Sequence, residues 1–454
     1  MPKNTECDTD VKKQGSSSSE SEESSEDEEV PAKRPFLPGI SADLAENEEL
    51  EVDMKAYRMY YQVQMDIPSL SFDIIHDNLG ESRILERGGP PIKSYLVLGS
   101  QAKSFNNNQI QLLKLSNMRP LKELTSTDSD SDSELSDDET DDLPNIEAVQ
   151  YKHKGSINRI RCNHLMDKYF AAVWSESGKV SIWELSSGIQ ALNDGSLLQD
   201  FNKRDHHKPT FISSQKKEGF ALDWSKPVPG RFASGDIDGN IFIFDACDAT
   251  WSCSKPYTGH TAAVEDIQWS PTEATVFISC STDKSIRVWD SRNKSHRPMV
   301  DLEEAHSSDV NVCSWNRIQS NSLLSGGDDG SLRVWDLRMC KQSTNVTKSV
   351  IKGYTHLFEY HKKPITSVEW HPEDAGVFAA SSEDNQISLW DMNLEQDADE
   401  DQDADQELKQ IPVQLMFIHC GQEDIKEIHW HRQIPGLLIS TALDGLNVFR
   451  TINI

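Results

Sequence analysis

The residues whose types could support chemistry are a histidine, a serine and an aspartate that stand close together in the sequence. His260, Ser279 and Asp283 are followed by Trp289. A serine hydrolase uses the first three types, because the histidine activates the hydroxyl and the carboxylate orients the histidine. The same set recurs further along the chain, at His306, Ser325, Asp329 and Trp335. A catalytic constellation occurs once, so the recurrence favours a structural role, in which buried polar groups find partners.

Each set lies in a 27-residue pattern that occurs three times, at 264–290, 310–336 and 365–391. Every copy has a His four residues upstream, an Asp in a predicted turn and a final Trp-Asp pair. In the third copy these are His361, Asp384 and Trp390, while Ala380 takes the serine position, with Ser381 and Ser382 beside it. Self-similarity of this kind predicts a β-propeller, and the pattern resembles the WD-repeat family.

Each copy predicts two strands around a tight turn, which is Asp329-Gly330 in the second copy. A blade has apolar surface on both faces, so several blades must stack radially. Weaker copies extend the count to seven. They comprise strands at 69–75, 95–99, 110–115 and 148–153 for the first blade, and the segments 157–184, 220–245 and 425–449 for the second, third and seventh. The sequence therefore predicts an all-β, seven-bladed propeller over 67–454.

The formal net charge is −30, and three segments without a basic residue carry most of it: 16–29, 126–142 and 395–407. Such segments cannot bury enough apolar surface to fold, which predicts a disordered tail over 1–40 and two acidic insertions. They favour a basic partner and would repel nucleic acid. Their hydroxyl residues suit an acidophilic kinase, at Ser19, Ser24, Ser25, Thr127, Ser129, Ser131 and Ser136.

Eight cysteines are scattered without a Cys-x-x-Cys pair, so the sequence predicts small core residues in a reducing compartment and no metal site. It contains neither a secretory signal nor a long apolar run, and we expect a soluble, intracellular monomer. We expect no enzymatic activity and no cofactor.

Before the propeller, apolar residues recur at helical intervals, at Leu50, Met54, Tyr57, Tyr61 and Met65. An acidic pair with capping-box spacing precedes them, and Pro68 follows. The pattern predicts a helix within 41–66 that covers an apolar surface. The helix either packs on the propeller for stability alone or forms one wall of a peptide groove.

A helix before the first blade and an acidic insertion before the last resemble the histone-binding WD-repeat subunits of chromatin assembly and deacetylase complexes. The resemblance covers about residues 44–454. In that family the two segments form a groove for a basic histone helix, and its Pro-Pro pair is Ile411-Pro412 here. The resemblance implies a partner-binding groove at Leu50, Met54, Tyr57, Tyr61, Glu400, Asp401 and Pro412.

The chain is similar in more detail to the glutamate-rich WD-repeat family. The likeness rests on the acidic, Ser-rich beginning, Lys-Arg-Pro-Phe-Leu-Pro-Gly at 33–39, Phe-Ala-Leu-Asp-Trp-Ser at 220–225, Gly259-His260 and the insertion at 395–407. That family contains nucleolar factors of large-subunit ribosome assembly, which chaperone a basic ribosomal protein, and animal members also bind histones. The resemblance implies a non-enzymatic chaperone and scaffold in the nucleus and nucleolus.

Two alternatives remain open from the sequence. One is a chromatin protein that binds histones through the groove. The other is a substrate receptor of a cullin-type ubiquitin ligase, because Arg292 and Arg338 complete Trp-Asp-x-Arg boxes of the kind found in such receptors. In that case the two arginines contact the ligase adaptor.

Overall fold

The computed structural model describes residues 36–38, 41, 50–83, 90–121, 144–203, 208–248, 250–340, 353–395 and 411–454. Contacts divide the chain into two units, Met1–Leu50 and Glu51–Ile454. In the first unit, the Ser41 amide donates a hydrogen bond to the Leu37 carbonyl over 2.8 Å. The predicted acidic segments and their hydroxyl residues lie outside the described residues, apart from Glu395.

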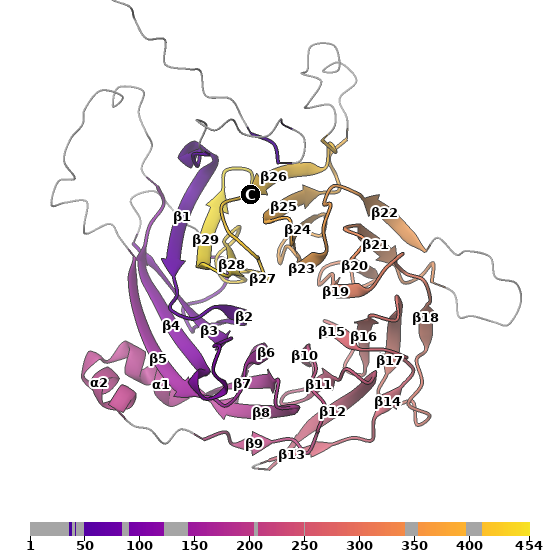
Figure 1. The fold of residues 1–454 in the computed structure, drawn as a ribbon, viewed down its shortest axis with the longest axis horizontal. Coiled ribbons are helices and arrows are strands. Elements are labelled where there is room, and N and C mark those ends of the chain that lie inside the picture. The colour runs from indigo at the N-terminus through magenta and orange to yellow at the C-terminus, as the bar shows by residue number, and fades with distance from the viewer. Residues whose placement is uncertain are drawn as a thin grey trace, which may run out of the picture. The chain divides into compact units, whose positions relative to one another are not determined.

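Within Glu51–Ile454, seven antiparallel sheets surround a central channel (Figure 1), which confirms the predicted seven-bladed propeller. Each sheet is one blade, and its strands run outward from the channel. The strands predicted for the first blade are present. Blade 1 contains β2 (Ser69–Ile75), β3 (Ile92–Ser100), β4 (Gln109–Met118) and β5 (Asn145–Lys152). Blade 2 contains β6 (Ile157–Leu165), β7 (Lys168–Ser175), β8 (Lys179–Glu184) and β9 (Phe211–Ile212).

The next blades include the three strong sequence repeats, which form blades 4, 5 and 6. Blade 3 contains β10 (Ala221–Trp224), β11 (Phe232–Gly235), β12 (Asn240–Cys247) and β13 (Thr250–Cys253), with β14 (Tyr257–Thr258) also beside β12. Blade 4 contains β15 (Val264–Trp269), β16 (Val276–Ser281), β17 (Ile286–Asp290) and β18 (Val300–Leu302). Blade 5 contains β19 (Val310–Trp315), β20 (Ser322–Gly327), β21 (Leu332–Asp336) and β22 (Tyr354–Phe358). Blade 6 contains β23 (Ile365–Trp370), β24 (Val377–Ser382), β25 (Gln386–Asp391) and β26 (Leu415–His419).

Blade 7 joins the two ends of the propeller. It contains β27 (Glu427–Trp430), β28 (Leu438–Ala442), β29 (Gly445–Thr451) and, on its outer side, β1 (Tyr57–Gln64). Strand β1 pairs with β29 from Tyr57 opposite Thr451 to Gln64 opposite Gly445. The ring is therefore closed by hydrogen bonds between its earliest and latest strands.

The helix predicted within 41–66 is wrong where β1 lies. A 3-10 helix spans only Met54–Ala56, and residues 42–49 are outside the described part of the chain. In β1 the buried residues Tyr57, Met59 and Val63 alternate with exposed ones, as a strand requires. The physical reason is that β29 would otherwise leave an unpaired sheet edge, and β1 fills it.

Two short helices, α1 (Ser186–Asn193) and α2 (Gly195–Lys203), connect β8 to β9 and were not among the predicted elements. Ala191, Leu192 and Phe201 pack into the apolar cluster between blades 1 and 2, which includes Tyr151. Similar clusters fill the other spaces between blades, so each blade is buried on both faces. Among the described residues, no helix is long and apolar enough to span a membrane.

Candidate functional site

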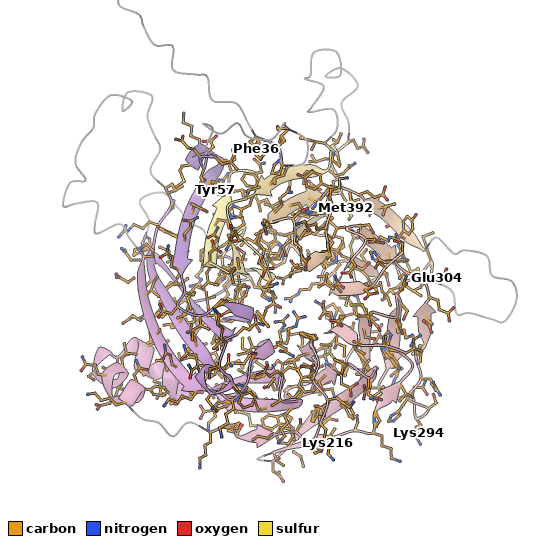
Figure 2. All side chains as sticks on the ribbon, viewed as in Figure 1. Phe36, Tyr57, Lys216, Lys294, Glu304 and Met392 are labelled. Atoms are coloured by element: carbon orange, nitrogen blue, oxygen red, sulfur yellow. The ribbon has the colours of Figure 1, made fainter. Side chains whose placement is uncertain are left out.

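Charged side chains gather in the central channel, where the innermost strand of each blade faces a cavity of about 520 Å³. Side chains from these strands reach into the opening (Figure 2). The sequence predicted apolar strands here and did not single out these residues. The only signal was the presence of charges at alternate positions of the inner strands, namely Asp73, Arg159, Arg161, Asp223, Asp266, Glu369, Glu427 and His429.

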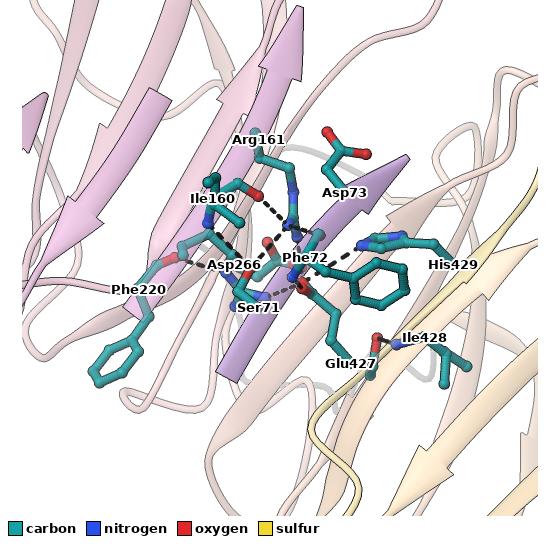
Figure 3. Close-up of polar contacts among 12 residues, drawn as sticks. Ser71, Phe72, Asp73, Ile160, Arg161, Phe220, Asp266, Glu427, Ile428 and His429 are labelled. Atoms are coloured by element: carbon teal, nitrogen blue, oxygen red, sulfur yellow. Dashed lines mark hydrogen bonds and ion pairs between the residues drawn. The ribbon is translucent and has the colours of Figure 1, made fainter. Parts of the chain in front are cut away.

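Glu427 is the centre of an ion-pair cluster that joins three blades (Figure 3). Arg159 Nη1 and Arg161 Nη2 lie 2.7 Å and 2.6 Å from Glu427 Oε1. The Phe72 amide donates a hydrogen bond to Glu427 Oε2 over 2.8 Å. Burial alone would raise the pKa of Glu427, but the two arginines and His429 hold it well below its usual range. Glu427 is therefore an ionised, fully occupied acceptor.

His429 lies between two carboxylates in the same cluster. Its Nδ1 is 2.9 Å from Glu369 Oε2, and its Nε2 is 3.6 Å from Glu427 Oε1. Burial favours the neutral ring, but Glu369 and Glu427 outweigh it and raise the pKa of His429 to about 9. At neutral pH this side chain is an imidazolium ion, which cannot act as a general base.

Channel side chains also bond each blade to the next one through backbone amides. The Cys162 amide donates to Asp73 over 2.7 Å, and the Trp269 amide donates to Asp223 over 2.8 Å. Equivalent bonds run from Trp315 to Gln268, from Cys313 to Asp266 and from Trp430 to Glu369. These acceptors stabilise the ring, since a buried amide without a partner costs free energy. Within the described residues, no group of three His, Cys, Asp or Glu side chains could hold a metal ion.

The repeated polar residues meet inside their own blades. In blade 4, His260 Nδ1 lies 2.9 Å from Asp283 Oδ2, and Nε2 lies 2.7 Å from Ser279 Oγ. The indole of Trp289 donates to the same hydroxyl over 2.8 Å. Blade 5 repeats this geometry with His306, Ser325, Asp329 and Trp335. Ser279 and Ser325 are fully buried, so no substrate can reach either hydroxyl.

Blade 6 completes the network with a serine that the sequence pattern did not indicate. His361 Nε2 lies 2.8 Å from Ser388 Oγ, and Trp390 donates to it over 2.7 Å, while Asp384 takes its expected place 2.9 Å from His361 Nδ1. Ser388 faces Ala380 across the β24–β25 pair. The hydroxyl therefore comes from the neighbouring strand and occupies nearly the same position in space.

The predicted groove residues are only partly brought together. Tyr57 is buried, where its hydroxyl lies 2.8 Å from His419 Nδ1, and its ring contacts Phe417 at 5.4 Å. Tyr61 donates to the Arg119 carbonyl over 2.9 Å. Leu50, in the first unit, and Met54 are exposed, and Pro412 is partly exposed. Glu400 and Asp401 lie outside the described residues. The segment before β2 and the segment at 411–419 do lie side by side, through Tyr57 and Phe417.

The two predicted adaptor-binding arginines are exposed but paired. Arg292 and Arg338 leave 73% of their side chains accessible. Each binds the Asp of its own Trp-Asp pair, Asp290 or Asp336, with a guanidinium nitrogen 2.6 Å from a carboxylate oxygen. Hydrogen bonds from the arginines lower the pKa of both aspartates. Their guanidinium groups are thus oriented by the turn that follows each repeat.

Comparison with known proteins gives two family matches. The family of the histone-binding protein RBBP4 and of its counterpart in the CAF1 complex matches residues 47–119. The family described as "WD domain, G-beta repeat" matches 251–290, 299–336 and 353–391, which are the regions of the three strong repeats.

Three relatives match nearly the whole chain. The chain is 42% identical to ribosome assembly protein rrb1 of Schizosaccharomyces pombe, over 95% of this chain and 87% of that protein. It is 38% identical to protein HEAT STRESS TOLERANT DWD 1 of Arabidopsis thaliana, over 95% and 94% of the two chains. It is 39% identical to glutamate-rich WD repeat-containing protein 1 of Dictyostelium discoideum, over 90% and 83%.

Proposed function

The chain belongs to the glutamate-rich WD-repeat family, and from this we propose that it is a non-enzymatic chaperone and scaffold in the assembly of the large ribosomal subunit. The observation that carries the proposal is the 42% identity to ribosome assembly protein rrb1 over most of both chains. The proposed partner is a basic protein of the large subunit, and the proposed location is the nucleus and nucleolus, where such subunits are assembled.

The charge of the chain supports a basic partner. Its net charge is −30, and acidic segments interrupt the propeller between β4 and β5 and between β25 and β26. A ribosomal protein without its RNA carries many unneutralised Lys and Arg residues. A negative chain offers exchangeable counter-charge and accelerates encounter. The acidic segments would therefore act before the partner reaches the ribosome precursor.

We place the specific contact with the partner at the edge where β1 and β26 meet. Val52, Met54 and Val413 are 44%, 36% and 39% exposed there. The acidic segment 395–407 precedes β26 in the sequence. An exposed apolar edge beside negative charge suits an amphipathic basic segment, which buries its apolar face and keeps its cations near the carboxylates.

Affinity purification of the tagged full chain, followed by mass spectrometry at low and high salt, tests this proposal. We expect large-subunit proteins in the low-salt sample and fewer at high salt, because exposed charges are screened. The variant Met54→Asp/Val413→Asp should recover less of them. The control Leu443→Asp changes a residue that is 52% exposed between β28 and β29. Purification without any ribosomal protein, or equal recovery by all three chains, would contradict the proposal.

Histones are a second candidate partner, which the family match at residues 47–119 favours. The same purification separates the two candidates, because it identifies the basic proteins directly. Depletion of the protein provides a second measurement, since a ribosome assembly role predicts loss of free large subunits. Recovery of histones without a change in ribosomal subunits would assign the protein to chromatin instead.

Binding to a cullin-ligase adaptor is a third candidate, which the exposed Arg292 and Arg338 support. The variant Arg292→Ala/Arg338→Ala should keep its unfolding midpoint, because both side chains are largely exposed and surface ion pairs contribute little. Loss of a co-purified adaptor in this variant would support the candidate. An unchanged partner list would remove it.

A further inference from the structure

One mouth of the central channel is surrounded by basic side chains. The inner strands β10, β19 and β27 end at Trp224, Trp315 and Trp430. Shortly beyond these ends, Lys226, Arg317 and Arg432 line the channel cavity. The amide bonds between successive inner strands keep them in matching register, so their ends meet at the same mouth. We call these three residues the cationic mouth.

Two of these cations are available to a ligand. Lys226 and Arg317 are exposed, and neither makes a hydrogen bond or an ion pair with another described residue. The carboxylates deeper in the channel, by contrast, already accept backbone amides, as Asp73 and Asp223 do from Cys162 and Trp269. A chain with a net charge of −30 thus displays unpaired positive charge at this mouth.

His76 also lines the cavity at the cationic mouth. Burial lowers the pKa of His76 to about 4, and Lys226, Arg317 and Arg83 lower it further against the effect of Asp73. The imidazole is therefore neutral at physiological pH. A neutral ring can donate one hydrogen bond to an anion without adding charge.

A second cavity, of about 250 Å³, adjoins the mouth and shares Ile75, His76 and Tyr169 with it. Its wall is largely apolar and includes Leu79 and Ile189. A ligand that fills both places needs an anionic group and a neighbouring apolar group. A peptide supplies both within a few residues, whereas free phosphate or a nucleic-acid backbone lacks the apolar group.

We propose that the cationic mouth binds a peptide with a phosphorylated serine or threonine next to an apolar residue. The phosphate lies between Lys226, Arg317 and Arg432, and the apolar side chain enters the cavity beside Leu79. Guanidinium groups match phosphate oxygens with paired N–H donors, and a dianion balances more of the charge than a carboxylate does. The carboxylates inside the channel keep the phosphate at the mouth. This site is separate from the proposed partner edge at β1 and β26.

Fluorescence anisotropy with the full-length protein tests the site. The probe is a labelled peptide pool with one phosphoserine followed by leucine, compared with the same pool without phosphate and with glutamate in its place. We expect the phosphorylated pool to bind at least about tenfold more tightly than either, because charge-assisted hydrogen bonds are lost in both. Inorganic phosphate should compete only weakly, since it leaves the apolar cavity empty.

Variants then locate the binding. Lys226→Gln/Arg317→Gln/Arg432→Gln should weaken the phosphorylated pool at least about tenfold. Leu79→Ser should weaken it several-fold, because Leu79 is exposed and its change leaves the fold intact. The control Lys255→Gln/Lys294→Gln/Arg297→Gln removes as many charges from exposed positions away from the channel, and Lys294 lies at the periphery in Figure 2. It should bind like the unchanged protein.

Several results would overturn the proposal. These are the absence of phosphate-dependent binding at peptide concentrations up to about 1 mM, and equal losses in the mouth and control variants. Equal affinity for the glutamate pool would assign the mouth to acidic peptides in general. Complete competition by inorganic phosphate at equal concentration would reduce it to an ion site. None of these results depends on the ribosomal partner, so the two proposals can fail separately.

Discussion

Asp329 shows how much one side chain contributes to a blade. Its carboxylate lies 3.0 Å from His306 Nδ1 and accepts hydrogen bonds from Ser331 Oγ and the Ser307 amide. Burial would raise the pKa of Asp329, but these donors hold it well below its usual range. Burial lowers the pKa of His306, so the ring is neutral and donates through Nδ1. Its other nitrogen is the acceptor for the Ser325 hydroxyl.

We expect Asp329→Ala to lower the free energy of unfolding by about 1–3 kcal/mol, because the His306 N–H loses its acceptor in a buried site. Urea unfolding measures the change. Asp328→Ala is the matched control, since Asp328 is exposed in the same turn. Equal losses in both variants would assign the effect to the charge of the turn and not to the network.

His429 predicts a pH dependence of stability. Its pKa is raised from 6.5 to about 9 in the folded protein. Its stabilising contribution is therefore complete below pH 6.5 and is lost as the pH rises through 9. We expect His429→Gln to be less stable than the unchanged protein at about pH 6, by at most about 3 kcal/mol, and the difference to shrink by about pH 10. Unfolding curves across this range measure it, with the exposed His356→Gln as control. A constant difference would mean that His429 is neutral.

Single residues were predictable from the sequence where the repeat fixes their place. His260, Asp283 and Trp289 follow from spacing alone, because each blade repeats one local geometry. Ser388 did not follow, since it reaches His361 from the next strand. The contact of Arg161 with Glu427 was also hidden, because it joins residues from opposite parts of the sequence that only ring closure brings together.

At the scale of elements, β1 is the clearest test. Met59 is buried in β1, whereas Gln62 is exposed on the same strand. We expect Met59→Asp to destabilise the propeller by several kcal/mol or prevent folding, because a charge enters the core without a partner. Gln62→Asp should leave the unfolding midpoint nearly unchanged. Circular dichroism and thermal unfolding of both variants decide it, and similar effects would contradict the observed register.

The segment that became β1 was predicted as a helix because its apolar residues satisfy two periods at once. Tyr57 and Tyr61 fit a helical stripe, but Tyr57, Met59 and Val63 fit alternation equally well. Tyrosine and valine favour strands. What decided the outcome was a hydrogen-bonding partner, β29, that lies at the other end of the propeller. Local sequence contains no information about such a partner.

At the scale of the whole molecule, charge predicts how a basic partner is held. We expect a chain without 16–29, 126–142 and 395–407 to remain folded, keep less of a co-expressed basic ribosomal protein soluble, and bind it with a smaller salt dependence. The physical reason is that exposed charges act over a screening distance of about 8 Å at physiological ionic strength. Binding measured across a salt series tests this. Unchanged protection and an unchanged salt slope would show that the segments only aid solubility.

The overall architecture was predictable because the blades repeat. Three strong copies fixed the blade length, and weaker copies such as 157–184 could be aligned to them. The channel was not predictable in the same way. Its ion pairs join β6 to β27, and its amide bonds join each blade to a different neighbour, so they exist only in the closed ring.

The pairing of β1 with β29 also sets an order in time. During translation β1 leaves the ribosome early, yet its partner strand is made some 380 residues later. At about 5–20 residues per second, this delay lasts about 20–80 seconds. Throughout it, Met59 and Val63 have no partner strand, and unpaired strands of this kind invite aggregation. A protein proposed to protect others before assembly thus passes through an exposed interval of its own, which ends only when its last blade is synthesised.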